Sequence, residues 1–299
     1  MVMKRGCVIG YDINEKGCQI SYYDDSMEEP DTMMASSNNY LIPLVLGYFK
    51  DRWVFGKEAK RLAVVGEDCT ETDLYGKAKR REKVSLAGKT YDAVWLLAKY
   101  ISLTLQDFEN IQYLTFTTPE TDVDMAKMLK GIGQHIGVDK EIINVQDYKE
   151  SFCQYMIFQP KELWQYESAL FYCDEDRIKA YMLRRLRVDA SHGMNSFVTV
   201  DEVANAQRKE LEALYPIMNK EKSPDESFKS MIENVFEKKV ISSVYLTGEG
   251  FEKNWYPNSL RVLCNGRRAF MGNNLYSKGA CYKSIRKCEP NDDGPIYLD

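Results

Sequence analysis

The sequence predicts an α/β protein made of two similar lobes. Two segments repeat one design, in which an apolar strand turns sharply beside an aspartate and returns as a second strand: CVIGYDI with GCQISYY at 7–23, and SALFYCD with RIKAYML at 168–183. Asp12 and Asp174 are expected to hold the same place in the two hairpins. The length of 299 residues suits two domains of about 150 residues. Strands that alternate with helices after each hairpin indicate mixed sheets with helices packed on them.

The first lobe is placed at 1–165, with a small inserted subdomain at about 27–90. An acidic stretch at 24–39 is expected to be a loop, and apolar residues at helical spacing predict a helix within 91–107. The other expected elements are two strands around a turn at Lys50 and Asp51, a short helix from Gly56, a strand at 111–117, a helix that begins after Pro119, a strand at 141–145 and a helix after Asp147.

The second lobe is placed at 166–299, with a helical insert at about 185–240. Two helices are predicted in this insert, at 200–219 and at 225–239, and Ser223-Pro224-Asp225 is a typical start signal for the second. The remaining expected elements are a strand at 242–248, a helix at 257–265, a strand at 268–271, a helix at 273–284 and a last strand that begins in GPIYLD.

The composition of the chain excludes several classes of function. A net charge of −5 argues against nucleic-acid binding, which needs an extended basic surface. The apolar runs are far shorter than the ~20 residues that span a bilayer, so membrane insertion is not expected. Eight cysteines without a C-x-x-C pair, and two histidines, favour reduced thiols in a cytoplasmic protein over a zinc site. The expected partner is another protein, with Trp255 and Tyr256 as candidate exposed contact residues, and the oligomeric state is left open.

Five segments, taken in order, resemble the ATPase domain of the actin, sugar kinase and heat-shock chaperone superfamily, and the chaperone branch is the most similar. The segments are VIGYDINEKG, IPLVLGYFKDRWVFGKEAKRLA, TFTTPETDVDMAKMLKGIGQHIG with VQDYKESFCQY, FYCDEDRIKAYML, and VYLTGEGFEKNWYPNSL with LYSKGACYKSI. The resemblance implies two RNase-H-like lobes that face each other across a cleft for Mg-ATP. It places Asp12, Asp147 and Asp174 on catalytic acids, Asp12 and Asp174 on the Mg²⁺ site, and Asn14, Gly248 and Gly250 on nucleotide-binding positions.

The phosphate-binding segments depart from the family pattern. Family members have a glycine and a hydroxyl residue after the first aspartate and a run of glycines after the second, because glycine lets backbone N–H groups approach a phosphate. Here Asn14 and Glu15 follow the first, and Glu175, Asp176 and Arg177 follow the second. A structural role is the alternative for the three acids, since an aspartate after a strand satisfies the N–H groups of the turn and Asp147 suits a helix cap.

Three functions follow from these observations. The first is a degenerate ATPase fold that no longer hydrolyses ATP and acts as a scaffold or regulatory module through protein–protein contacts. The second is an active Mg-ATP-dependent ATPase, chaperone-like or filament-forming, with unusual phosphate loops. The third is a small-molecule kinase of the same superfamily, for which the sequence offers no substrate motif.

Overall fold

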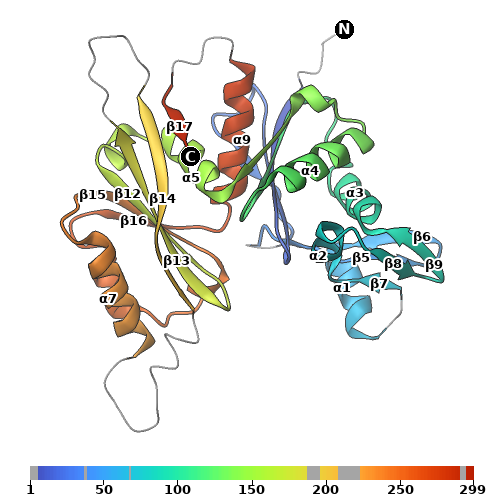
Figure 1. Ribbon diagram of the computed structural model, residues 1–299, viewed down its shortest axis with the longest axis horizontal. Helices are drawn as coiled ribbons and strands as arrows, with labels where there is room; N and C mark the ends of the chain where they lie inside the picture. Colours follow the sequence, from blue (N-terminus) through green and yellow to red (C-terminus); the bar gives the residue numbers. More distant parts are fainter. Residues whose placement is uncertain (1–5, 37–38, 67–68, 187–195, 208–222, 290–293) are drawn as a thin grey trace. The chain divides into compact units, whose positions relative to one another are not determined.

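The computed structural model describes residues 6–36, 39–66, 69–186, 196–207, 223–289 and 294–299. The chain has a mixed α/β fold, as predicted, and divides into two compact units (Figure 1). The first unit comprises Met1–Ser151 with Tyr276–Asn291, and the second comprises Phe152–Leu275 with Asp292–Asp299. Each unit has a mixed sheet of its own, so we describe the units one at a time.

The main sheet of the first unit is centred on β1 (Cys7–Ile13). Its strands lie in the order β3 (Asp31–Thr32), β2 (Gly17–Tyr23), β1, β10 (Ile111–Thr118) and β11 (Ile143–Asp147), and β4 (Ile42–Pro43) also pairs with β2. β2 is antiparallel to β1, whereas β10 is parallel to β1 and β11 is parallel to β10. The β1–β2 turn therefore lies at the edge of the sheet where β10 and β11 end.

The residues between β2 and β10 add smaller sheets and helices. They form β5 (Leu46–Phe49), β6 (Arg52–Phe55), α1 (Gly56–Val64), β7 (Thr70–Glu71), α2 (Leu74–Lys79), β8 (Lys83–Leu86), β9 (Lys89–Asp92) and α3 (Ala93–Thr104). β5 pairs with β6 and β7, and β8 pairs with β9. The predicted turn at Lys50 and Asp51 is confirmed, and both residues have positive φ. Asp92 caps α3, because its carboxylate accepts from the N–H groups of Val94 and Trp95.

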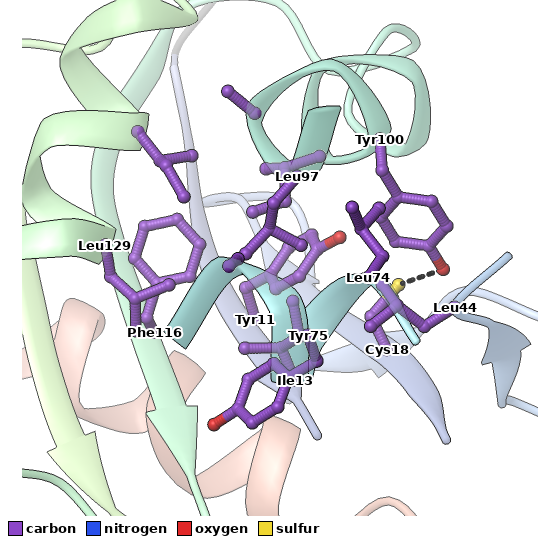
Figure 2. Packing of buried hydrophobic residues seen from close by; sticks show 14 of the residues in the cluster. Tyr11, Ile13, Cys18, Leu44, Leu74, Tyr75, Leu97, Tyr100, Phe116 and Leu129 are labelled. Carbon is purple, nitrogen blue, oxygen red and sulfur yellow. Dashed lines mark hydrogen bonds between the residues drawn. The ribbon is translucent and has the colours of Figure 1, made fainter. Parts of the chain in front are cut away.

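One face of the main sheet carries the apolar core of the first unit (Figure 2). Ile9, Tyr11 and Ile13 alternate along β1, so they point to the same side of the sheet. Helices α2, α3 and α4 (Val123–His135) contribute buried residues such as Leu97 to the same cluster. The Tyr100 hydroxyl lies 3.4 Å from Cys18 Sγ, so the polar atoms inside this core are paired with each other.

The opposite face is lined by small and polar residues and is covered by α9 (Leu275–Cys288). Gly10 brings the β1 backbone very close to this helix, because an added Cβ would overlap the Ser277 carbonyl oxygen and the Cys281 nitrogen. The Ser21 hydroxyl is 2.8 Å from that of Ser277. The Ser284 hydroxyl is 2.8 Å from that of Thr115 and donates to the Ile9 carbonyl at 3.1 Å. This face is therefore held by close backbone approach and hydroxyl hydrogen bonds.

The second unit repeats the strand order of the first. Its sheet runs β16 (Arg268–Met271), β15 (Ile241–Thr247), β12 (Glu167–Cys173), β13 (Arg177–Leu186), β14 (Phe197–Gln207) and β17 (Ile296–Leu298). β13 is antiparallel to β12, while β15 is parallel to it. Residues of α7 (Pro224–Phe236) and α8 (Pro257–Leu263) pack with one face of the sheet, and a segment with α5 (Tyr148–Ile157) supplies Phe152 and Tyr155 against Tyr245 on the other face.

The helix predicted at 200–219 is wrong for its first eight residues, because 197–207 form the strand β14. β14 pairs with β13 along its whole length, with one irregularity between Ala180 and Tyr181. Val200, Val203 and Ala204 have helical spacing, but β-branched residues such as Val198 and Thr199 favour a strand that can pair with a long neighbour. The rest of that predicted helix lies outside the described residues.

Most other predicted elements are confirmed within a few residues of their ends, including both hairpins, α1, α3, α4, α7, α8, α9 and the strands β10, β11, β15, β16 and β17. The expected loop at 24–39 contains the two-residue strand β3. All eight cysteines are free thiols. Among the helices of the described ranges, none has the length and apolar character that crossing a membrane requires.

Candidate functional site

Asp12 is a buried acid on the α9 face of the first sheet. Asp12 lies two residues after Gly10 in β1 and is only 3% exposed. Its Oδ1 accepts a hydrogen bond of 2.8 Å from the Tyr148 hydroxyl. Burial raises the pKa of Asp12 from 3.8 to about 7, and the Tyr148 hydrogen bond partly opposes this shift. Close to neutral pH, a large fraction of Asp12 is therefore protonated and uncharged.

Tyr148 connects this acid to the hairpin turn and to α9. Its hydroxyl also accepts a hydrogen bond of 3.0 Å from Asn14 Nδ2. Its ring stacks on Tyr276 with centroids 3.7 Å apart and planes 8° from parallel. Sequence reasoning missed Tyr148. This residue directly follows Asp147, the last residue of β11, and is the first residue of the next helix. Because β11 runs parallel to β10, the start of that helix lies at the edge of the sheet where β1 also ends.

Asp147 caps α5. Its Oδ1 accepts a hydrogen bond of 2.8 Å from the N–H of Glu150, which is the contact expected of an N-cap residue. The Lys149 ammonium lies 3.9 Å from its other carboxylate oxygen. The structure thus gives Asp147 a helix-capping contact, and the next residue, Tyr148, hydrogen-bonds to Asp12.

The turn of the first hairpin is closed by the side chain of Asn14. Asn14 Oδ1 accepts from the N–H groups of Lys16 and Gly17 at 2.9 and 3.2 Å. The backbone N–H of Asn14 donates to the Gly17 carbonyl at 3.0 Å. Two backbone N–H groups of this turn are therefore satisfied by the turn itself.

Asp174 closes the turn of the second hairpin in the same way. Its Oδ1 accepts from the N–H groups of Asp176 and Arg177 at 2.7 and 2.8 Å, and its own N–H donates to the Arg177 carbonyl at 3.1 Å. Glu175 and Asp176 lie in the bend and are exposed. Asp174 is thus used as a turn-closing residue, the structural alternative foreseen for it.

The expectation that Asp12 and Asp174 hold the same place is wrong. β1 continues to Ile13 after Asp12, whereas β12 ends at Cys173 before Asp174. In the first hairpin Asp12 pairs with Gln19, and in the second Tyr172 pairs with Lys179. Each of these is the second-to-last residue pair before the turn of its hairpin. Asn14 is therefore the counterpart of Asp174, and Tyr172 is the counterpart of Asp12.

Gly248 and Gly250 pack against the second hairpin. Gly248 has φ of +100°, and an added Cβ would overlap the Cys173 carbonyl oxygen. A Cβ on Gly250 would overlap Cys173 Sγ. The Gly248 N–H donates to Asn273 Oδ1 at 3.0 Å. The structure brings these two glycines together with Asp174, and close packing on β12 accounts for the absence of a side chain at both positions.

Tyr256 was expected to be exposed, and that expectation is wrong. It is buried, and its hydroxyl donates to the Phe251 carbonyl at 3.2 Å. Trp255 is partly buried against the apolar core of the second unit, and its indole N–H donates to the Gly250 carbonyl at 2.7 Å. Tyr256 therefore does not form part of the surface, whereas the ring of Trp255 is exposed in part.

The residues of the first hairpin do not fit a magnesium ion. Mg²⁺ prefers ionised carboxylates that keep room for several waters. Asp12 is buried, burial raises its pKa, and its Oδ1 already accepts from Tyr148. In the part of the chain that the structure describes, no three His, Cys, Asp or Glu side chains are grouped so that they could hold a metal ion.

Comparison with known proteins places the chain in a family. Residues 29–299 match the family described as "Family of unknown function (DUF5716) C-terminal", which covers most of the chain. The chain therefore belongs to that family. No curated protein matches the sequence.

Proposed function

We propose that this protein is a degenerate member of the actin-like ATPase superfamily that does not hydrolyse ATP and acts as a scaffold or regulatory module through protein–protein contacts. The strand orders β3-β2-β1-β10-β11 and β14-β13-β12-β15-β16 support two RNase-H-like units. In both units the second strand of the hairpin, β2 or β13, is antiparallel to the first. On the other side of the first strand, β10 and β11 in one unit and β15 and β16 in the other run parallel to it. The proposal thus rests on the same topology occurring twice in one chain.

The hydrogen bonding of the two turns is the observation that carries the loss of ATP hydrolysis. In the proposed family, the backbone N–H groups of these turns bind the phosphates of ATP. Here Asn14 Oδ1 and Asp174 Oδ1 each accept two of those N–H groups. A phosphate would have to displace these side chains before it could be bound.

Charge opposes phosphate binding at the second turn as well. Asp174, Glu175 and Asp176 are consecutive acids, and the last two are exposed. At ~4 Å and an effective dielectric constant of ~20, each contact between like charges costs about 4 kcal/mol. The charge of the second turn therefore opposes the binding of a polyphosphate.

A role in protein contacts is supported by apolar side chains on the surface of the first unit. Val64 and Val65, at the end of α1, are 83% and 74% exposed. Contact surfaces are marked by contiguous apolar patches, and we take these two adjacent valines as the candidate centre of one. The free cysteines are consistent with a reducing compartment, and we place the protein in the cytoplasm.

Calorimetric titration of the purified protein with Mg-ATP tests the proposal. We expect no saturable heat and no rise in melting temperature at millimolar ligand. Binding with a Kd below about 100 μM, which corresponds to about −5.5 kcal/mol, would overturn it if Asp174→Ala abolished that binding. ATP turnover above that of an Asp12→Ala, Asp174→Ala double variant would instead establish the active ATPase, and phosphoryl transfer to a metabolite would establish the kinase.

A further inference from the structure

A cavity of about 350 Å³ lies at one end of the second unit's sheet. It is formed where β12 and β15 begin and β13 ends. The lining residues are Gln165, Tyr166, Glu167, Arg184, Arg185, Leu186, Lys238, Lys239 and Val240. The Asp174 turn is at the other end of β12, about 23 Å away for seven residues of strand. The cavity is therefore separate from the hairpin site discussed above.

The cavity is basic in a chain that carries a net charge of −5. Four lining residues are cationic and one, Glu167, is acidic. Arg184 is already paired, because its guanidinium contacts Glu167 Oε1 at 2.9 Å and Asp201 Oδ2 at 3.2 Å. The Lys239 ammonium donates to the Val235 carbonyl, in the last turn of α7, at 2.7 Å.

Arg185 and Lys238 are the cations left to meet a ligand. The Arg185 guanidinium lies over the ring of Trp164, 5.7 Å from its centroid, and makes no ion pair within the described part of the chain. The Lys238 side chain is 90% exposed and only loosely paired, with its ammonium 3.5 Å from Glu237 Oε1. An exposed pair of this kind contributes little to stability, so Lys238 can exchange Glu237 for another anion at small cost.

Glu167 is the acidic residue of the cavity, and its carboxylate is used within the protein. Its Oε1 is occupied by Arg184, and its Oε2 is buried, without accessible surface for a ligand to contact. The cavity therefore offers two cations, Arg185 and Lys238, for an anionic group.

We propose that this cavity binds a small organic anion that carries a carboxylate or phosphate group. Arg185 and Lys238 hold the anionic group. The volume falls in the range of small-molecule sites, and the exposed Tyr166 and Val240 give the rim an apolar part. The proposal is independent of the actin-like assignment, because it uses the opposite end of the sheet.

Calorimetric titration of the whole chain with matched probes tests it. Malate and succinate differ by one hydroxyl, glycerol 3-phosphate supplies a phosphate with hydroxyl donors, and glycerol is the neutral control. We expect malate or glycerol 3-phosphate to bind with a Kd of about 1 mM or tighter, and glycerol not to bind. Malate binding shows a carboxylate site and glycerol 3-phosphate binding shows a phosphate site. Succinate should bind as malate does, because the two cations contact a carboxylate that both molecules carry.

Variants assign the binding to the cavity. Lys238→Glu reverses the charge of a fully exposed side chain, so it should fold normally and weaken binding about tenfold or more, and Arg185→Gln should do the same. Lys229→Glu, on the exposed part of α7 and outside the cavity, is the matched control and should leave binding unchanged. The proposal is overturned if none of the anions binds saturably, or if binding persists unchanged in both Lys238→Glu and Arg185→Gln.

Discussion

β1 and β12 occupy the same position in sheets of the same strand order, yet the residues on one of their faces differ in kind. β1 presents Gly10 and Asp12 to a helix that approaches its backbone, whereas the corresponding residues of β12 are Leu170 and Tyr172. In the first unit that face is joined to α9 by serine and threonine hydroxyls. In the second unit the same face holds Tyr245 packed against Phe152 and Tyr155. The topology is thus common to both units, and the chemistry depends on what covers each sheet.

The largest expected effect comes from Asp12, which has no acidic counterpart in β12. Its pKa is about 7 in the folded protein against 3.8 for a free side chain, so the folded state holds the proton more tightly. Stability is then greatest below pH 4 and falls as the pH rises to 7. Asp12→Asn removes this dependence. The difference in unfolding free energy between the variant and wild type should therefore change in favour of the variant by about 4 kcal/mol from pH 4 to pH 8, at 1.36 kcal/mol per pKa unit.

Urea unfolding at both pH values measures that gain, with the exposed Asp124→Asn in α4 as the control. An Asp12→Asn curve that follows the wild type at both pH values would show that Asp12 is ionised in the folded protein. The assignment of a protonated, metal-free acid to β1 would then be incorrect.

Gly10→Ala should give the next largest effect, because the added Cβ meets the backbone of α9 and backbone cannot move aside as a flexible side chain can. Overpacking of this kind costs about 3 kcal/mol. Gly131→Ala in α4 is the control, since its Cβ would enter open space and a helical alanine is favourable. Thermal unfolding of the two variants checks the prediction, and equal melting temperatures would mean that α9 does not lie as close to β1 as described.

Tyr148→Phe separates the hydroxyl from the ring. The Tyr276 stacking is retained, but Asp12 and Asn14 lose their shared partner. We expect a loss of about 1–2 kcal/mol, as for a buried hydrogen bond to an ionisable group. Because that hydrogen bond lowers the pKa of Asp12, NMR titration of the Asp12 carboxyl should show a further rise in the variant. An unchanged titration would exclude Tyr148 as its partner in solution.

The smallest effect should come from Asp174→Asn. Asn14 already shows that an asparagine can accept both N–H groups of such a turn, so stability should change by less than about 0.5 kcal/mol. Asp174→Ala removes the acceptor and should cost about 1–2 kcal/mol. Urea unfolding of the two variants side by side measures the difference. A large loss in Asp174→Asn would mean that the charge of Asp174, and not its turn geometry, is what the fold requires.

The strands and helices could be predicted because hydrophobic spacing and capping residues act locally. CVIGYDI and SALFYCD are apolar runs beside turn residues, and Ser223-Pro224-Asp225 does begin α7. The segment at 200–207 was misjudged because its pairing with β13 is a contact between strands that no local pattern encodes.

The site could be predicted only in part. Asp12 was found from its place in the hairpin. Whether Asp12 and Asp174 correspond depends on where each strand ends, and the two positions differ by two residues. The hydrogen bond from Tyr148 joins residues 136 positions apart, and the stack on Tyr276 is also a contact between residues far apart in the sequence. The protonation of Asp12 follows from burial by these partners, so the sequence alone does not contain it.

The position of α9 in the chain has a consequence for synthesis on the ribosome. The first unit needs this helix to cover β1, yet residues 275–288 are made after nearly all of the second unit. At about 5–20 residues per second, synthesis from the end of β11 to the end of α9 takes about 7–28 seconds, and that face is uncovered during this time. An uncovered face that is rich in glycine, hydroxyl groups and other polar side chains is far less prone to aggregate than an apolar one. The hydroxyl-rich character of this face thus suits a unit whose last helix arrives late.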